Sequence, residues 1–308
     1  MFSYLHWSTL VPGALAALLV LFVLARFAAA VTRKVADPNV IRIYLATLGL
    51  GTAYGMAISV ISVFLTARGY RETDIGTLAA WFAAGIMLTA VASGSLVEKL
   101  GAKLVLVIAL FTYATTVALF PFAPSYAAIA ALRFFDGAAS VLVWVASETI
   151  LVARARREIK AYVTSIYGMS IAVGYGFGSL GAFLAATVLP NERVFLVAGA
   201  LSAVTGALVL LRLDKGADAH HEAASDTASG EAVTERAPLG TLVNRVKTSG
   251  FATFAYGYFQ SSVVLFLPLF MKDEKGIPQE KTRLITFFFA IGMLLAISVA
   301  GSLGGRYG

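Results

Sequence analysis

The sequence predicts an all-α fold, a polytopic bundle of helices that cross a membrane. Apolar residues occupy 59% of the 308 positions and charged residues only 13%, whereas soluble domains have about 45–50% and about 25%. The apolar residues also gather into nine runs, each close to the roughly 20 residues that a helix needs to span a bilayer. The lipid bilayer is therefore the predicted surroundings of this chain.

Nine spanning helices are predicted, and most of them are joined by short polar connections. They are Thr9–Val31, Val40–Thr66, Ile75–Gly94, Lys103–Phe120, Ser125–Val152, Ala161–Val188, Val194–Leu211, Gly250–Met271 and Leu284–Gly301. The first run has an alternative interpretation as a signal peptide that is cleaved near Ala28-Ala29-Ala30. Its leading residues Met1–Trp7 contain no Lys or Arg, although a signal peptide begins with positive charge. We therefore expect an extra, uncleaved helix over residues 1–35.

A polar interval divides the remaining helices into two groups. Asp214–Pro238 carries six carboxylates against two basic residues, a composition that cannot bury enough surface to fold. We expect a six-helix bundle over residues 36–212, a flexible cytoplasmic linker over 213–247 and the first two helices of a second bundle over 248–308. The adjacent His220 and His221 have no further ligands placed with them, and the chain has no cysteine. No metal or other cofactor is expected.

The distribution of Lys and Arg predicts the orientation of the chain. If the turn with Lys99 and Lys103 is cytoplasmic, 15 of the 24 basic residues lie on that side and 7 on the other, while Arg26 and Arg133 lie within apolar runs. This bias predicts an integral protein of a bacterial-type inner membrane, with its N-terminus outside and its C-terminus in the cytoplasm. It also accounts for the net charge of +7 without nucleic acid as a partner.

The turn after the third predicted helix is the most specific motif. It reads GSLVEKLGAK over Gly94–Lys103, and its glycine spacing returns in Gly301–Gly308 after the ninth helix. Glycine permits tight turns and close helix approach, and charges at helix ends interact with the helix dipole. Two related halves, each with such a turn, are typical of internally repeated membrane transporters.

The same turn resembles a motif of the major facilitator superfamily, which reads G-x-L-a-D-r-x-G-r-k between the second and third helices. The matching positions are Gly94, Leu96, Glu98, Lys99, Gly101 and Lys103. Ala102 departs from the pattern, and Gly305 replaces the acidic residue in the second copy. The resemblance implies a cytoplasmic gate formed by this turn, and the alternative is a loop whose charges only orient the chain.

Glu148 and the pair Arg133 and Asp136 are ionisable positions of the fifth predicted helix. Glu148 either accepts Lys99 or Lys103 as a gate contact or pairs with nearby arginines. Arg133 and Asp136 lie well inside the hydrocarbon, where ionisable groups are costly and usually functional. Their spacing places both on one helix face, so that each can neutralise the other.

Arg133 and Gly137 also resemble the R-x-x-x-G pattern on the fourth helix of the family, which is linked to proton coupling. Asp136 departs from that pattern, because a polar uncharged residue is common there. Two interpretations stay open for the pair: a structural ion pair that orients two helices, or a role in coupling or substrate binding.

The sixth predicted helix contains a glycine run that imitates a nucleotide-binding fingerprint. Gly176–Gly181 reads G-x-G-x-x-G, but that motif requires a preceding strand and a βαβ unit. Close packing of helices through Gly174 and Gly178 is the physical explanation that we expect. Ser179 follows Gly178 where the antiporter signature of the family has proline, so this motif does not support an exchange mechanism.

Polar and aromatic positions in several helices are candidates for lining a solute cavity. They are Tyr54, Tyr167, Tyr175, Tyr256 and Gln260. Tyrosine is also common at membrane interfaces, so packing is the alternative for each of them.

The resemblance to the major facilitator superfamily covers residues 36–308 and implies alternating access around a central site. We expect a secondary transporter of a small solute, with protons as a second partner, and no enzyme activity because no catalytic constellation is present. The alternative is a non-transporting membrane scaffold or receptor derived from a transporter. Since the family has six helices in each half, we further expect this chain to be a fragment that stops inside the second half.

Overall fold

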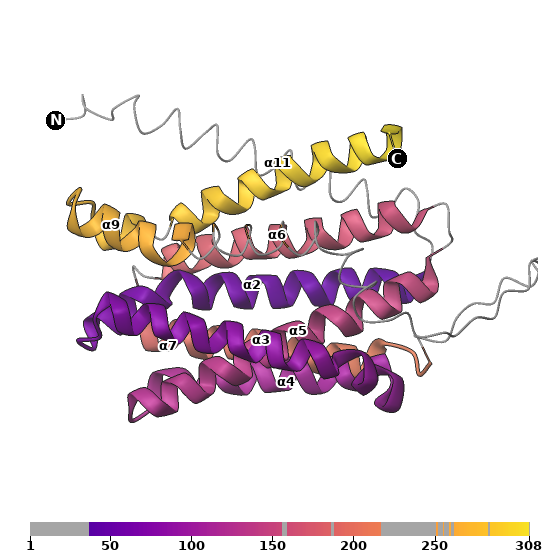
Figure 1. Ribbon diagram of the computed structural model, residues 1–308, viewed down its shortest axis with the longest axis horizontal. Helices are drawn as coiled ribbons and strands as arrows, with labels where there is room; N and C mark the ends of the chain where they lie inside the picture. Colours follow the sequence, from indigo (N-terminus) through magenta and orange to yellow (C-terminus); the bar gives the residue numbers. More distant parts are fainter. Residues whose placement is uncertain are drawn as a thin grey trace, which may run out of the picture.

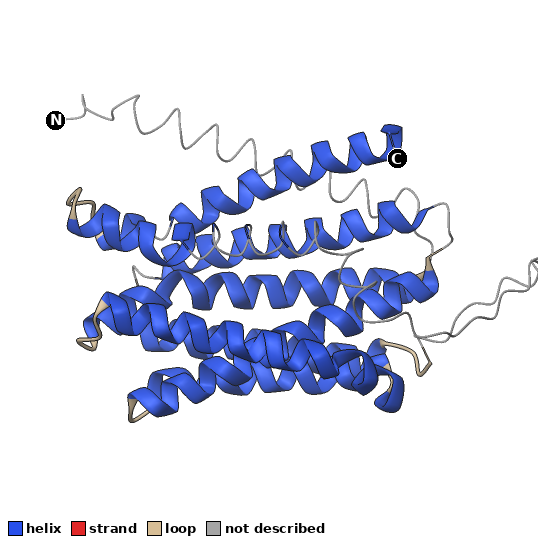
Figure 2. Ribbon diagram, in the orientation of Figure 1, coloured by secondary structure: helices blue, strands red, loops and turns tan. Residues whose placement is uncertain are grey.

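The computed structural model of the chain describes residues 37–155, 159–185, 188–216, 251, 255, 259, 262–282 and 284–307. Within these residues the chain is helical and contains no strand, as predicted (Figure 2). The predicted first helix, most of the linker and the cavity candidates Tyr256 and Gln260 lie outside the described residues.

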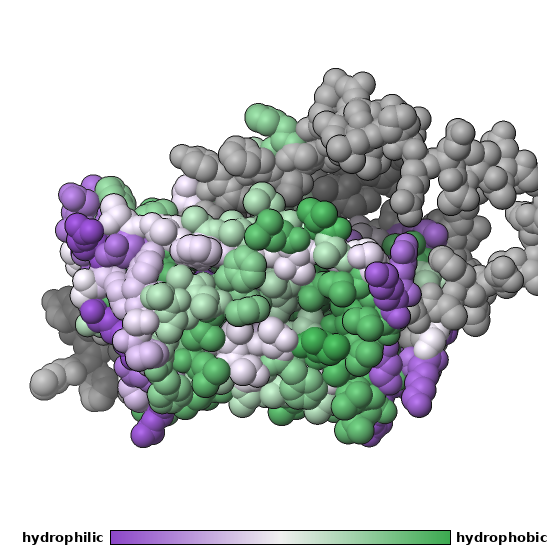
Figure 3. Space-filling model, turned by 60° about the horizontal axis from the view of Figure 1, so that its bottom comes forward, coloured by the Kyte–Doolittle hydropathy of each residue, from purple (hydrophilic) through white to green (hydrophobic). Residues whose placement is uncertain are grey.

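Six long helices run side by side along the long axis of the molecule (Figure 1). They are α2 (Pro38–Ala67), α3 (Glu72–Leu100), α4 (Ala102–Leu119), α5 (Tyr126–Arg154), α6 (Lys160–Ala185) and α7 (Asn191–Arg212). All six are long and apolar enough to cross a membrane. On the face shown in Figure 3, hydrophilic residues gather at the two ends and hydrophobic residues cover the middle. This is the pattern of a bundle that spans a bilayer.

The later part of the chain adds shorter elements and one long helix. After the 3-10 turn η1 (Phe120–Phe122) in the first bundle come the π-helical turn η3 (Ser262–Phe266), α9 (Leu267–Asp273), α10 (Gln279–Thr282) and α11 (Leu284–Tyr307). Helix α11 packs along the outer side of α6 (Figure 1). Residues 301–307, which belong to the second copy of the glycine motif, therefore form the end of α11.

Local sequence determines where the long helices begin and end. Asp37 caps α2, because its carboxylate accepts the backbone N–H of Asn39 at 2.8 Å. Ser125 caps α5 in the same way through the N–H of Ala128. Gly69 and Gly101 have φ angles of 83° and 81° at the turns before α3 and α4, a conformation that glycine adopts at little cost.

Helix α2 packs closely against α6 because glycines line the contact between them. A Cβ atom on Gly51 would lie 2.7 Å from the carbonyl oxygen of Ile171, and one on Gly178 would overlap the backbone of Thr52. In lipid, helices associate through such close van der Waals contacts rather than through the hydrophobic effect. The packing role predicted for Gly174 and Gly178 is confirmed, since both meet the backbone of α2.

Candidate functional site

Arg133 and Asp136 form an ion pair on one face of α5, in the interior of the six-helix bundle. The exposed fraction is 6% for Arg133 and 5% for Asp136. The guanidinium of Arg133 also lies over the ring of Phe82 from α3, 4.4 Å from its centroid. The sequence predicted the pairing and the burial from the i, i+3 spacing and the position within the helix, and the structure confirms both.

Gly137 and Gly85 allow α3 to approach α5 beside this pair. A Cβ atom on Gly137 would lie 2.9 Å from the carbonyl carbon of Phe82, and one on Gly85 would lie 2.9 Å from the carbonyl carbon of Phe134. The two contacts are reciprocal, since each glycine faces the backbone of the other helix. The close approach places Phe82 over Arg133, which gives the glycine of the R-x-x-x-G pattern a physical role.

A cavity of about 10 Å³ lies next to the ion pair. It is lined by Tyr54, Ala57, Ile58, Ile61, Tyr113, Thr116, Val117, Phe120, Leu132, Arg133, Asp136 and Phe195. Pockets for organic ligands have volumes of about 300–1,000 Å³, whereas about 10–15 Å³ is enough for one water molecule. This cavity is therefore the size of a water site and far too small for a solute.

The two carboxylate oxygens of Asp136 have different surroundings. Oδ2 is paired with Arg133, whereas Oδ1 is buried and has no hydrogen-bond partner among the described residues. A buried acceptor without a partner costs about 1–3 kcal/mol, and more when it is charged. The carboxylate is thus poised to accept one further hydrogen bond or a proton at Oδ1.

Three tyrosines from different helices converge on the same region. The ring of Tyr54 on α2 lies 6.4 Å from that of Tyr113 on α4 and 5.6 Å from that of Tyr175 on α6. Tyr54 and Tyr113 line the same cavity as Arg133 and Asp136. Of the predicted cavity residues, Tyr54 therefore lines the cavity beside the ion pair, and Tyr175 packs against Tyr54.

The third described cavity candidate, Tyr167, lies in a different apolar cluster from Tyr54 and Tyr175. It is 3% exposed. Sequence reasoning missed Phe82, Tyr113 and Thr116, which surround the pair. A tyrosine and a threonine within a long apolar run were the signal for two of them, but the sequence does not indicate which way these side chains face.

Most of the predicted gate motif lies in a helix and not in a loop. Helix α3 continues to Leu100, so that Gly94 lies inside the helix with nothing within 4 Å of its Cβ position, and the turn itself consists of Gly101. Glu98 and Lys99 are exposed on the last turn of α3. The expected tight turn is therefore formed by one glycine of the motif rather than by both.

Of the two contacts left open for Glu148, the one with a lysine of the motif does not form among the described residues. Lys103 instead donates to the backbone carbonyl oxygen of Leu213, because α4 packs against α7. Glu148 is exposed and makes no ion pair within the described part of the chain. Its neighbours Ser147 and Ile150 occupy the face of α5 that is buried in the bundle.

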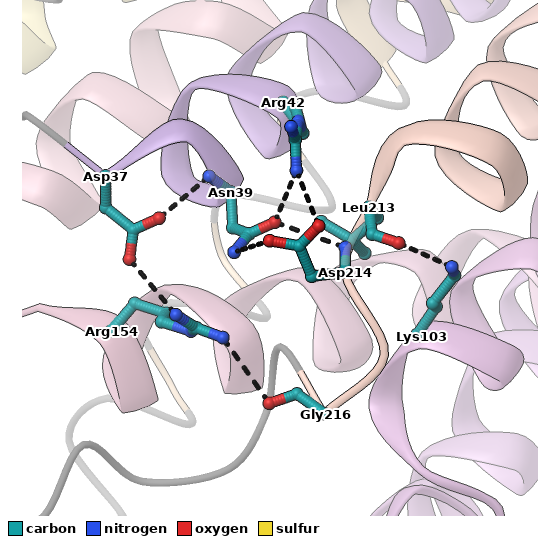
Figure 4. Close-up of polar contacts among 8 residues, drawn as sticks. All are labelled: Asp37, Asn39, Arg42, Lys103, Arg154, Leu213, Asp214 and Gly216. Atoms are coloured by element: carbon teal, nitrogen blue, oxygen red, sulfur yellow. Dashed lines mark hydrogen bonds and ion pairs between the residues drawn. The ribbon is translucent and has the colours of Figure 1, made fainter.

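A polar cluster holds the residues that follow α7 against the ends of three other helices (Figure 4). We call it the clasp, and its members are Asp37, Asn39, Arg42, Lys103, Arg154, Leu213, Asp214 and Gly216. Asp214 is paired with Arg42 at 3.1 Å, and Arg154 lies 3.5 Å from Asp37. Arg154 also donates to the carbonyl oxygen of Gly216 at 3.4 Å. Residues 213–216 of the predicted linker are therefore docked on the bundle, and the turns that carry Lys103 and Arg154 lie at the same end of it.

The described residues contain no group of three or more His, Asp or Glu side chains that could hold a metal ion. The chemistry available at the Arg133–Asp136 site is binding of a proton or a polar group by a buried carboxylate next to a fixed cation.

Comparisons with known proteins found a matching family profile, related sequences and a similar solved structure. A family profile described as "Major Facilitator Superfamily" matches residues 43–308. The quinolone resistance protein NorA of Staphylococcus aureus (strain N315) is 27% identical over 163 residues, which cover 52% of this chain and 40% of NorA, and NorA of strain COL matches equally. The chain thus matches less than half the length of these relatives.

Among solved structures, the nucleoside transporter NupG is similar to this chain. The TM-score is 0.65 at 17% sequence identity, over 88% of this chain and 69% of NupG. At this identity the likeness concerns the fold.

Proposed function

The chain belongs to the Major Facilitator Superfamily, and on that premise we propose that it acts as a secondary active transporter of a small solute by alternating access. The observation that carries the proposal is the family match over residues 43–308, which takes in most of α2 and all of α3–α7 and α11. It favours transport over the alternative of a non-transporting scaffold. In this mechanism two helical bundles rock about a central site and expose it to each side of the membrane in turn.

Proton coupling through Asp136 is the second part of the proposal. A carboxylate at bilayer depth is costly, and here Arg133 neutralises it through Oδ2 while Oδ1 remains open to a proton. Binding of a proton would remove the negative charge and leave Arg133 without its counter-ion. The site would then favour a rearrangement that restores the balance of charge, which is the physical basis for coupling proton movement to solute movement.

The orientation proposed for the chain places the motif turn in the cytoplasm. The excess of Lys and Arg at that end supports this orientation. The location of Lys103 and Arg154 at one end of the bundle is consistent with it.

Transport by the full chain in proteoliposomes tests the proposal. The names of the relatives supply the first probes, a quinolone and a nucleoside, each followed under an imposed pH gradient. We expect the gradient to drive transport in the wild type and to lose its effect in Asp136→Asn. Glu72→Gln is the matched control, because Glu72 is an exposed carboxylate at the start of α3. If Asp136→Asn keeps the full dependence on the gradient, Asp136 is removed from coupling.

A further inference from the structure

We propose that the cavity beside the ion pair is a binding site for one water molecule, which donates a hydrogen bond to Asp136 Oδ1. The inference rests on the geometry of the described bundle and stands whether or not the protein transports protons. Its consequence for coupling, however, rests on the proposed function.

The first support is the fit between the cavity and its occupant. A cavity of about 10 Å³ is close to the lower limit for one water molecule, and a buried water needs two to four polar partners. Wholly apolar cavities of this size stay dry. Seven of the twelve lining residues are apolar here, but Asp136, Arg133, Thr116 and two tyrosines add polar groups to the wall. The size of the cavity and the presence of these polar partners favour water.

The second support is the unsatisfied acceptor. Asp136 is only 5% exposed, its Oδ2 is paired with Arg133, and its Oδ1 has no partner in the described residues although Asp136 lines the cavity. Buried polar atoms in proteins nearly always have a partner, and ordered water supplies it where no side chain does. Thr116 already donates its hydroxyl hydrogen to the carbonyl oxygen of Tyr113 at 3.0 Å, so its oxygen is left as an acceptor for the second hydrogen of the water.

The groups that face this site define what a proton would meet there. They are Arg133 and Asp136 from α5, Tyr54 from α2 and Tyr113 from α4. Tyr175 from α6 does not line the cavity and packs against Tyr54. A proton that arrives on the water, as hydronium, would pass to Asp136 Oδ1 and leave a neutral water and a neutral carboxyl group. The water would then be the last carrier before the coupling carboxylate.

A mutant cycle distinguishes a water site from an empty void. Ala57 lines the cavity, and Ala57→Val would fill it with methyl groups. In a void the added methyls improve packing, whereas in a water site they expel the water and leave Asp136 Oδ1 without a partner. We expect Ala57→Val to lower the apparent melting temperature of the detergent-solubilised full chain by about 3–6 °C, and to lower it far less in the background Arg133→Met/Asp136→Leu.

The double-variant background isolates the contribution of the carboxylate. Overpacking by the two added methyl groups would lower the melting temperature whether or not Asp136 is present, whereas loss of the water matters only when its acceptor is there. Equal shifts in the two backgrounds, or a higher melting temperature for Ala57→Val alone, would overturn the proposal.

A structure of the full chain at a resolution that shows ordered waters provides the direct measurement. A water within about 2.5–3.2 Å of Asp136 Oδ1 supports the site, and a cavity without such density overturns it. Neither this readout nor the melting temperature depends on transport, so failure of the water site and failure of the transport proposal are distinguishable.

Discussion

Asn39 and Asp214, which are 175 positions apart in the sequence, exchange two hydrogen bonds at the end of the bundle. The side-chain Nδ2 of Asn39 donates to Asp214 Oδ2 at 3.0 Å, and the backbone N–H of Asp214 donates to Asn39 Oδ1 at 3.3 Å. Asn39 Oδ1 also accepts from Arg42 at 3.0 Å. A buried amide that uses both its polar atoms in this way fixes the end of α7 against the start of α2.

Asn39→Ala is expected to weaken the clasp. The substitution removes three hydrogen bonds of a residue that is 2% exposed, and we expect a loss of about 1–2 kcal/mol, or a few degrees in melting temperature. Thr77→Ala is the control, because the exposed Thr77 bonds only to the carbonyl oxygen of Thr73 in its own helix. Equal melting temperatures for the two variants would contradict the role of Asn39.

The clasp is also expected to respond to acid through Asp214. The hydrogen bond from Asn39 holds the pKa of the Asp214 carboxyl below its usual value, lost hydration opposes this, and Arg42 lowers the pKa further. Because the folded-state pKa is depressed, the stabilisation is present above the unfolded-state pKa of about 3.9 and is lost as the pH falls through the folded-state pKa.

Melting curves between pH 7 and pH 3 measure this effect. At pH 7 the wild type is expected to have a higher melting temperature than Asp214→Asn. The difference in melting temperature should shrink towards the acid end of the range. A difference that stays constant over the whole range would show that the charge of Asp214 does not stabilise the clasp.

The spacing of apolar and charged residues was enough to predict the six spanning helices α2–α7 and the buried pair on α5. Both features follow from local periodicity, because i and i+3 share a helix face whatever surrounds the helix. The clasp was not predictable in this way. It joins Asn39 to a residue that the composition assigned to a linker, and such a contact depends on how α2 and α7 are placed beside each other.

The gate motif shows the same limit on a smaller scale. The glycine at position 101 was correctly assigned to a turn, since only the local backbone decides that. The choice between the two contacts left open for Glu148 depended on which way α5 is rotated, and the structure places Lys103 against the end of α7. Direction around a helix axis is set by packing partners that are far away in sequence.

Gly137→Ala is expected to separate α3 from α5. The added methyl would overlap the backbone of Phe82, so the helices must move apart at a cost of about 1–3 kcal/mol, and Arg133 would lose its contact with the Phe82 ring. Gly181→Ala is the matched control, because nothing lies within 4 Å of that position. Thermal melting of both variants measures the difference, and a Gly137→Ala protein as stable as Gly181→Ala would contradict the close approach.

The two glycines of the gate motif are expected to respond in opposite directions. Gly101 has φ 81° and ψ 143°, a region that is nearly restricted to glycine, and Gly101→Ala should cost about 1–3 kcal/mol. Gly94 lies inside α3 with open space around it, and Gly94→Ala should stabilise the helix by up to about 1 kcal/mol. Melting temperatures test the pair, and destabilisation by Gly94→Ala would show that this glycine has a close neighbour.

Labelling of single cysteines is expected to place the motif turn and the α5–α6 connection on one side of the membrane. The chain has no cysteine of its own, so that Lys99→Cys and Lys160→Cys, both at exposed positions, each give a single reporter. Lys103 and Arg154 both contact residues 213–216, and those contacts require the two turns to lie at the same end of the bundle. A maleimide that cannot cross the membrane should therefore label both variants in inside-out vesicles and neither in intact cells, if that end is cytoplasmic. Glu72→Cys, at the opposite end of α3, is the control with the reverse pattern. Labelling of Lys99→Cys and Lys160→Cys from different sides would be incompatible with the clasp, and with the bundle that it closes.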